Sequence, residues 1–210
     1  MKKFDPSLYF ITDSTNYTEE EFLYRVEQAL KGGATLLQLR EKNKSTREYI
    51  SLAEKVHELT KKYNVPLIID DRIDVALAMG GEGVHLGQSD MPISTARKIL
   101  GDEFIIGATT KTVPQALEAY KQGADYLGVG AIYPTTTKVK TVLTSTDTLR
   151  DICNSVPIPV NAIGGLNKDN IDILKGIPIA GICVVTAIMK ADDPKGETEI
   201  LLKLAKELKK

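Results

Sequence analysis

The feature that most constrains this chain is a regular alternation of short apolar runs with longer amphipathic segments along all 210 residues. Short apolar runs separated by helical segments are typical of a parallel sheet covered by helices. The runs expected to form strands are 8–12, 35–39, 66–69, 83–86, 104–107, 126–129, 159–163 and 181–185. The alternation therefore predicts eight βα units.

Eight units in 210 residues favour a closed barrel over an open doubly wound sheet. The length is near the lower end of the roughly 200 to 250 residues usual for an α/β barrel, and no glycine-rich dinucleotide fingerprint follows the first strand. We therefore expect an α/β protein with a single (β/α)8 TIM-barrel domain over residues 1–210. Ligands of such barrels bind at the carboxyl ends of the strands.

Several helix starts carry a hydroxyl side chain followed three residues later by Glu or Gln, the pattern of a capping box. The pairs are Thr18 with Glu21, Ser45 with Glu48, and Thr112 with Gln115. His57 lies on the helix expected after the second strand. We interpret it as a surface or flank residue rather than a catalytic one.

The charge balance gives no indication of a general nucleic-acid or membrane partner, because 27 basic and 28 acidic residues leave a net charge of −1. The apolar stretch near the first residue is too short and too polar for a signal peptide. No apolar run is long enough to span a bilayer. Cys153 and Cys183 match no metal or redox spacing and are expected to be packing residues. These features predict a cytoplasmic protein with small-molecule partners, and they leave a homo-oligomer open.

Polar side chains follow most of the expected strands, where a barrel would gather them on one rim. They are Gln38, Arg40, Glu41 and Lys42 after the second strand, Asp70, Asp71 and Arg72 after the third, His85, Gln88 and Asp90 at the fourth, Thr109, Thr110 and Lys111 after the fifth, and Thr135, Thr136, Thr137 and Lys138 after the sixth.

Two pairs within this set indicate a chemistry. Arg40 and Lys42 are two residues apart, so in an extended chain both point to the same side and suit a diphosphate; an ordinary charged loop is the alternative. Asp71 and Asp90 offer hard oxygen ligands for Mg²⁺. The alternative there is an ion pair of Asp71 with the surroundings of Arg72.

Glycines after the seventh strand, in Ile163-Gly164-Gly165-Leu166, and a helix start after the eighth, at Val184 to Ile188, complete the rim. This arrangement is typical of the phosphate site of α/β barrels, where backbone N–H groups and a helix dipole face an anion. The alternative interpretation is that the two glycines only make a tight turn.

Taken in order, six segments resemble the thiamine phosphate synthase family. They are QLREK (38–42), DR-x-DVALA (71–78), GVHLGQSD (83–90), ADYLGVG-x-IYPT-x-TK (124–138), AIGG (162–165) and VVTAIM (184–189). The resemblance covers nearly the whole chain. It implies a transferase that joins a pyrimidine diphosphate to a thiazole phosphate with loss of pyrophosphate, in thiamine diphosphate biosynthesis.

The resemblance also implies roles for individual residues. By this resemblance, the catalytic residues that bind the diphosphate are Arg40, Lys42 and Lys138, and those that bind Mg²⁺ are Asp71 and Asp90. The pyrimidine is contacted by Gln38, and the substrate site also includes Asp70 and Thr109. The thiazole phosphate region includes Thr135 and Thr137, and the phosphate itself is held by Gly165, Val185 and Thr186. The implied mechanism is dissociative: the diphosphate leaves first and the thiazole nitrogen attacks the resulting cation. No protein nucleophile is needed, which fits a rim without a Ser-His or Cys-His pair.

The chain departs from the family pattern at three rim positions. Asp70 stands where the family usually has asparagine, Thr109 where it has serine, and Lys111 where histidine is common. A carboxylate beside a bound diphosphate is repelled by it. We therefore hypothesise that Lys111 offsets Asp70, or that Asp70 helps to hold a metal.

Residues 134–147 form the longest stretch without periodicity, which predicts a functional lid, although the glycine-rich stretch expected in the family is missing. Two alternative functions stay open from the sequence. One is a thiazole tautomerase of the same superfamily, which needs neither diphosphate nor Mg²⁺. The other is a barrel that binds phosphate without catalysis.

Overall fold

Eight parallel strands close into a barrel in the order in which they occur along the chain. The computed structural model describes residues 4–135 and 142–209. The strands are β1 Leu8–Ile11, β2 Leu36–Leu39, β3 Leu67–Asp70, β4 Gly83–Leu86, β5 Ile105–Thr110, β6 Tyr126–Gly130, β7 Val160–Ile163 and β8 Gly181–Val184. β8 pairs with β1 and closes the ring, which confirms the predicted (β/α)8 barrel.

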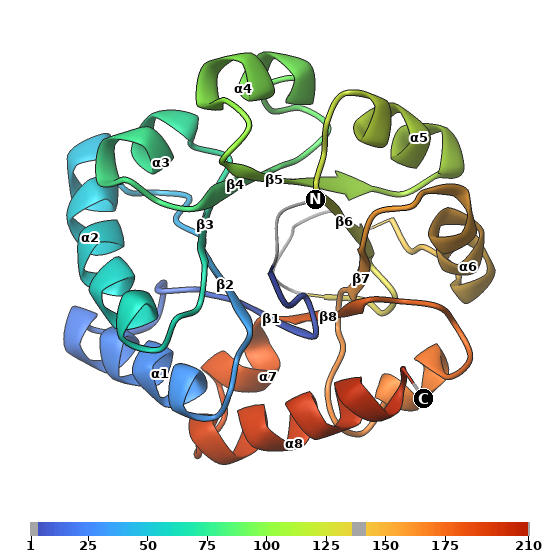
Figure 1. Cartoon of the computed structure of the whole chain (residues 1–210). Coiled ribbons are helices and arrows are strands. Elements are labelled where there is room, and N and C mark those ends of the chain that lie inside the picture. The colour runs from blue at the N-terminus through green and yellow to red at the C-terminus, as the bar shows by residue number, and fades with distance from the viewer. Residues whose placement is uncertain (1–3, 136–141, 210) are drawn as a thin grey trace.

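Helices surround the strands on the outside, as Figure 1 shows in a view along the barrel. They are α1 Glu19–Lys31, α2 Thr46–Lys62, α3 Ile73–Met79, α4 Ile93–Leu100, α5 Val113–Lys121, α6 Thr146–Ser155, α7 Thr186–Met189 and α8 Pro194–Glu207. A short 3-10 helix, η1 Ile171–Leu174, stands between β7 and β8. Among the residues described, no helix combines the length and apolarity needed to cross a membrane.

The capping boxes predicted at Thr18 and Ser45 are both complete, with the side chain of the third helical residue returning to the cap backbone. The capping box predicted at Thr112 forms only in part. Thr112 accepts a hydrogen bond from the backbone N–H of Gln115, but the Gln115 side chain accepts from Lys111 N instead, at 2.8 Å. The box fails because the neighbouring N–H competes for the same amide oxygen.

Two apolar clusters divide the core. The larger one fills the space between strands and helices, and the smaller one lies inside the barrel. The inner cluster consists of Tyr9, Ile11, Leu36, Ile68, Ile105, Tyr126 and Cys183. Cys183 is buried there and Cys153 packs against the outer cluster, so both are packing residues as predicted.

His57 is a flank residue, as predicted, but a buried one. Its Nε2 lies 2.9 Å from Glu82 Oε1, and the other oxygen of Glu82 accepts a hydrogen bond from Leu67 N at 2.8 Å. The pair connects α2 to the beginnings of β3 and β4, at the amino ends of these strands rather than at their polar carboxyl ends. Its role is structural.

Two boundaries differ from the sequence prediction near the site. β5 runs to Thr110, so Thr109 and Thr110 belong to the strand rather than to the loop after it. α6 begins at Thr146, with Ser145 as its cap, which shortens the aperiodic stretch predicted for 134–147. The centre of that stretch, 136–141, lies outside the described residues.

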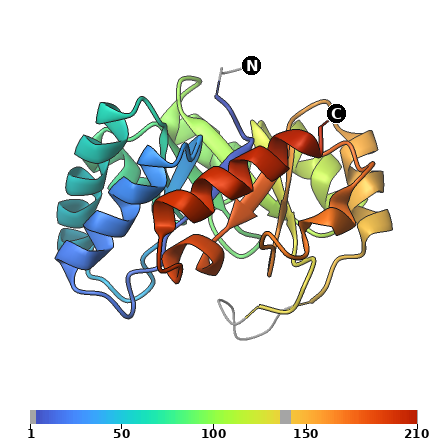
Figure 2. The same ribbon diagram turned by 90° about the horizontal axis from the view of Figure 1, so that it is seen from below.

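Figure 2 shows the barrel from the side, with the N-terminal segment and the end of α8 together at one end. α7, which follows β8 directly, lies at the opposite end. The opposite end is therefore the one at which the strands terminate. In α/β barrels it is the end that carries the ligand site.

Gly107 makes room for a tyrosine inside the barrel. It pairs with Tyr126 across β5 and β6, and a Cβ built on Gly107 would lie 2.0 Å from Cζ of that ring. Tyr126 is fully buried and contacts Phe4 and Tyr9 edge to face. The ring has no open side into which it could move.

We expect Gly107→Ala to lower the free energy of unfolding by about 2–3 kcal/mol, because overpacking a closed core forces strain. Chemical denaturation measures this directly. In the double variant with Tyr126→Leu the loss should be smaller than the sum of the two single losses. A Gly107→Ala variant as stable as the parent would contradict this packing.

Candidate active site

The side chains of QLREK alternate about the end of β2. Gln38 reaches into the barrel, where its Nε2 donates to Tyr9 OH at 2.7 Å, and Arg40 and Lys42 both reach Asp70 at the end of β3. Glu41 turns the other way and accepts from Ser14 Oγ at 2.8 Å. The prediction that Arg40 and Lys42 share a side is thus confirmed.

Asp70 is the centre of the charged cluster. Its Oδ2 lies 2.7 Å from Lys42 Nζ and 3.8 Å from Arg40 Nε, and its side chain is only 9% exposed. Burial raises the pKa of Asp70 to about 6, helped by the neighbouring charge of Asp71 and opposed by Lys42. Burial thus disfavours the charged form of Asp70, and the two neighbouring cations stabilise it.

These contacts correct one hypothesis from the sequence. The cations beside Asp70 are Lys42 and Arg40, whereas Lys111 Nζ donates to the carbonyl of Val142 at 3.0 Å. Lys111 thus connects the end of β5 to the segment before α6, and the charge of Asp70 is offset from β2.

Asp71 and Asp90 lie together beside this cluster. Asp71 has a left-handed backbone with φ of 59°, held by its N–H donating to His85 O at 2.9 Å; aspartate tolerates this region better than most residues. Asp90 is held by Gly87 N, which donates to its Oδ2 at 2.7 Å. The backbone of Asp71 is thus bound to β4, and the carboxyl group of Asp90 is oriented by the backbone of its own loop.

The two carboxyl groups interact directly, and their pKa values move apart. Burial and the hydrogen bond with Asp71 raise the pKa of Asp90. Burial opposes ionisation of Asp71 as well, but hydrogen bonds with Lys42 and Asp90 lower its pKa overall. Two carboxylates in contact repel each other unless a proton or a cation lies between them.

The alternative of an Asp71 ion pair near Arg72 is wrong. Arg72 Nε donates to Asp74 Oδ1 at 2.8 Å and its NH2 group to Thr46 Oγ1 at 2.6 Å, and Asp71 contacts Lys42 instead. Asp71 thus belongs to the charged cluster around Lys42. Within residues 4–135 and 142–209, no group of three or more His, Cys, Asp or Glu side chains could hold a metal by itself.

A chain of buried polar groups crosses the barrel below the charged cluster. Tyr9 OH lies 2.7 Å from Tyr126 OH, Tyr126 OH lies 3.1 Å from His85 Nδ1, and His85 Nε2 lies 2.8 Å from Thr109 Oγ1. Because Gln38 donates to Tyr9, every member is satisfied if each hydroxyl donates onward and His85 carries its proton on Nε2. The amide of Gln38 is thereby fixed in orientation.

Tyr9 and Tyr126 belong to this chain of polar groups but are not among the site residues predicted from the sequence. Both are aromatic residues in apolar strands and look like ordinary core. The signal that could have found them is period-two alternation, since Tyr9 and Tyr126 fall on the inward positions of their strands, like Gln38 and His85.

The segments expected to hold a phosphate follow β7 and β8. Gly164 and Gly165 have φ of 106° and 67°, and a Cβ on Gly165 would lie 2.6 Å from that of Tyr133. Val185 precedes α7 as its cap residue, and Thr186 is the first residue of that helix. The glycines thus pack against the segment after β6, on which Thr135 lies.

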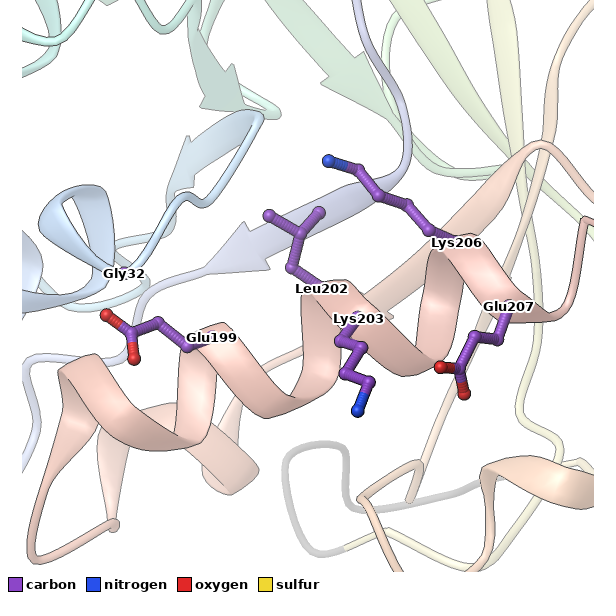
Figure 3. A pocket seen from close by; sticks show the side chains of 6 residues that line it. All are labelled: Gly32, Glu199, Leu202, Lys203, Lys206 and Glu207. Atoms are coloured by element: carbon purple, nitrogen blue, oxygen red, sulfur yellow. The ribbon is translucent and has the colours of Figure 1, made fainter.

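Two of the predicted residues, Thr137 and Lys138, lie outside the described residues, as does Thr136. A separate pocket lies beside α8, lined by Gly32, Glu199, Leu202, Lys203, Lys206 and Glu207 (Figure 3). It lies on the outer surface, with charges of both signs supplied by one helix. It belongs to a different part of the molecule from the polar strand ends.

Comparison with known proteins identifies the family. A family profile described as thiamine monophosphate synthase matches residues 8–188. The chain is 53% identical over 196 residues to thiamine-phosphate synthase 2 of Streptococcus pneumoniae, with 93% of each protein covered. It is 48% identical over 203 residues to the thiamine-phosphate synthase of Methanobrevibacter smithii, with 97% of each covered.

Among solved structures, the thiamine phosphate pyrophosphorylase from Pyrococcus furiosus matches with a TM-score of 0.89 at 43% identity, over 97% of both chains. Sequence and structure thus agree over almost the full length. The chain belongs to the thiamine monophosphate synthase family and is a transferase of thiamine biosynthesis.

Proposed function

We propose that the mouth of the barrel joins 4-amino-2-methyl-5-(diphosphooxymethyl)pyrimidine to 4-methyl-5-(2-phosphoethyl)thiazole, giving thiamine phosphate and pyrophosphate. The observation that carries this assignment is the convergence of Arg40 and Lys42 with the facing carboxyl groups of Asp71 and Asp90. Cations beside a pair of hard oxygen ligands are what a leaving pyrophosphate requires.

In this proposal Arg40 and Lys42 bind the diphosphate. Their side chains are 15% and 40% exposed, so Arg40 is largely buried while Lys42 is accessible to a ligand. Partial burial strengthens their attraction for an anion. Lys138 remains a predicted third cation for the same group.

Asp71 and Asp90 are the residues that would hold Mg²⁺. Their contact supports this role, because a divalent cation removes the repulsion between two adjacent carboxylates. Mg²⁺ characteristically takes one or two carboxylates and completes its shell with substrate phosphate and water. When bound, the ion would neutralise negative charge on the departing pyrophosphate.

Gln38 would orient the pyrimidine. With its Nε2 committed to Tyr9, its carbonyl oxygen can accept a hydrogen bond from the amino group of the ring. Tyr9, Tyr126, His85 and Thr109 would act through Gln38 by holding its amide in one orientation. Buried polar chains of this kind are rigid only when every member is satisfied.

The phosphate of the thiazole is proposed to bind at Gly165, Val185 and Thr186, with Thr135 and Thr137 nearby. The positive φ values of the two glycines and the helix start at Thr186 support this placement, because such turns present backbone N–H groups to anions. Asp70 and Thr109 complete the proposed substrate site.

The chemistry requires one bond to break and one to form. The C–O bond to the diphosphate breaks with both electrons leaving on pyrophosphate, the aminopyrimidine stabilises the methylene cation, and the thiazole nitrogen attacks that carbon. No proton moves in these steps, which agrees with a mouth whose polar groups bind and orient. The main contribution of the chain is electrostatic stabilisation of the leaving group.

The two alternatives are less well supported. A tautomerase would have no use for a diphosphate site, and a non-catalytic barrel would have no use for a metal pair. Relatives at 53% and 48% identity bear the name of the synthase. Small-molecule substrates follow from that family, while a cytoplasmic location and a homo-oligomer stay predictions.

Lys42→Met should raise KM for the pyrimidine diphosphate roughly 10- to 100-fold, the worth of a hydrogen bond from a charged group, and change KM for the thiazole phosphate far less. Steady-state kinetics with each substrate varied in turn measures both. Lys44→Met is a matched control, because Lys44 lies 3.9 Å from Glu41 on the same loop. Equal losses for the two substrates would mean that they are placed wrongly.

Omitting Mg²⁺ should abolish formation of thiamine phosphate and pyrophosphate from the two substrates. Asp71→Asn and Asp90→Asn should each raise the Mg²⁺ concentration for half-maximal activity at least about tenfold. Asp74→Asn, which removes an exposed partner of Arg72, should leave that concentration unchanged. Full activity in the presence of a chelator would refute the metal assignment.

A further inference from the structure

We propose that Asp70 competes with the diphosphate for Arg40 and Lys42, and that this competition promotes release of product pyrophosphate. The inference rests on the proposed placement of the diphosphate at these two cations. It assigns to Asp70 the role of a built-in competing anion, which goes beyond membership of the substrate site.

Asp70 is the most buried of the three charged side chains. Asp70 is 9% exposed, whereas Arg40 and Lys42 are 15% and 40% exposed. A substrate anion arriving from the mouth therefore meets Arg40 and Lys42 while both already lie beside the buried carboxylate of Asp70. Both anions draw on the same N–H donors.

The chemical similarity of the two anions makes the competition direct. Carboxylate and phosphate oxygens are acceptors for the same guanidinium and ammonium donors. The carboxylate of Asp70 cannot retreat into water, because it ends β3 and is packed below the rim. A bound diphosphate must therefore share its cations with a fixed negative charge a few ångströms away.

This arrangement has a consequence for turnover. A site that binds the diphosphate through Arg40 and Lys42 would also retain product pyrophosphate, and its release can then limit the rate. A fixed carboxylate lowers the affinity for the free anion. Asparagine has nearly the same shape without the charge, so Asp70→Asn isolates the electrostatic contribution.

The direct test is the affinity of the full chain for pyrophosphate alone, in the presence of a chelator and at about pH 8, well above the ordinary range for a carboxyl group. Isothermal titration calorimetry should show that Asp70→Asn binds pyrophosphate at least about fivefold more tightly than the parent. The control Asp74→Asn should match the parent, since it removes a carboxylate that pairs with Arg72.

A double-mutant cycle tests the route of the effect. In Lys42→Met, adding Asp70→Asn should give a much smaller gain in affinity, because one of the contested cations is gone. In turnover assays, Asp70→Asn should show stronger product inhibition by pyrophosphate against the pyrimidine diphosphate. General structural damage would weaken binding, so tighter binding cannot arise from it.

Two results would overturn the role of Asp70, and only the second of them would also overturn the proposed diphosphate site. Unchanged or weaker pyrophosphate binding by Asp70→Asn, with loss of binding in Lys42→Met, would remove the role of Asp70 and leave the proposed diphosphate site intact. Pyrophosphate binding that is unaffected by both Lys42→Met and Arg40→Ala would remove the site and the inference together.

Discussion

Parallel pairing of β2, β3 and β4 in register brings three short loops to one edge of the barrel, and the proposed chemistry depends on that proximity. Gln38 pairs with Ile68, and Asp70 pairs with His85, so the residues just beyond these positions meet. Arg40 and Lys42 follow β2, Asp71 follows β3, and Asp90 lies in the loop after β4. A shift of one residue would turn these side chains away from the mouth.

The resulting cluster is held by opposite charges rather than by apolar packing. Lys42 contacts both Asp70 and Asp71, and those carboxylates raise its pKa although burial acts in the opposite direction. Below this layer lies the hydrogen-bonded chain of side chains from Gln38 to Thr109. The proposed site therefore combines a charged rim, assigned to phosphate groups, with a hydrogen-bonded polar interior, assigned to the heterocyclic ring.

The sequence predicts the barrel well because the strand pattern and the helix caps are local signals. Apolar runs identify all eight strands, and the boxes at Thr18 and Ser45 form as expected. Asp71 and Asp90 could be paired from the sequence because adjacent parallel strands end side by side. These predictions depend only on neighbouring residues and on barrel topology.

Other features depend on contacts between distant segments, and the sequence does not reveal them. Tyr9 and Tyr126 are 117 residues apart, and their hydrogen bond is visible only once β1 and β6 both face the interior. Lys111 was expected to offset Asp70, but its Nζ donates a hydrogen bond to the carbonyl of Val142 instead. The partner of a long flexible side chain is set by three-dimensional proximity, which periodicity does not encode.

The central claim is that Arg40, Lys42, Asp71 and Asp90 form one binding site for pyrophosphate and Mg²⁺. A crystal structure of the protein with both ligands tests it most directly. The account predicts pyrophosphate in contact with Arg40 and Lys42, and a metal ion bridging it to Asp71 and Asp90. Pyrophosphate bound away from these cations, or a metal ion bound away from both carboxylates, would contradict it.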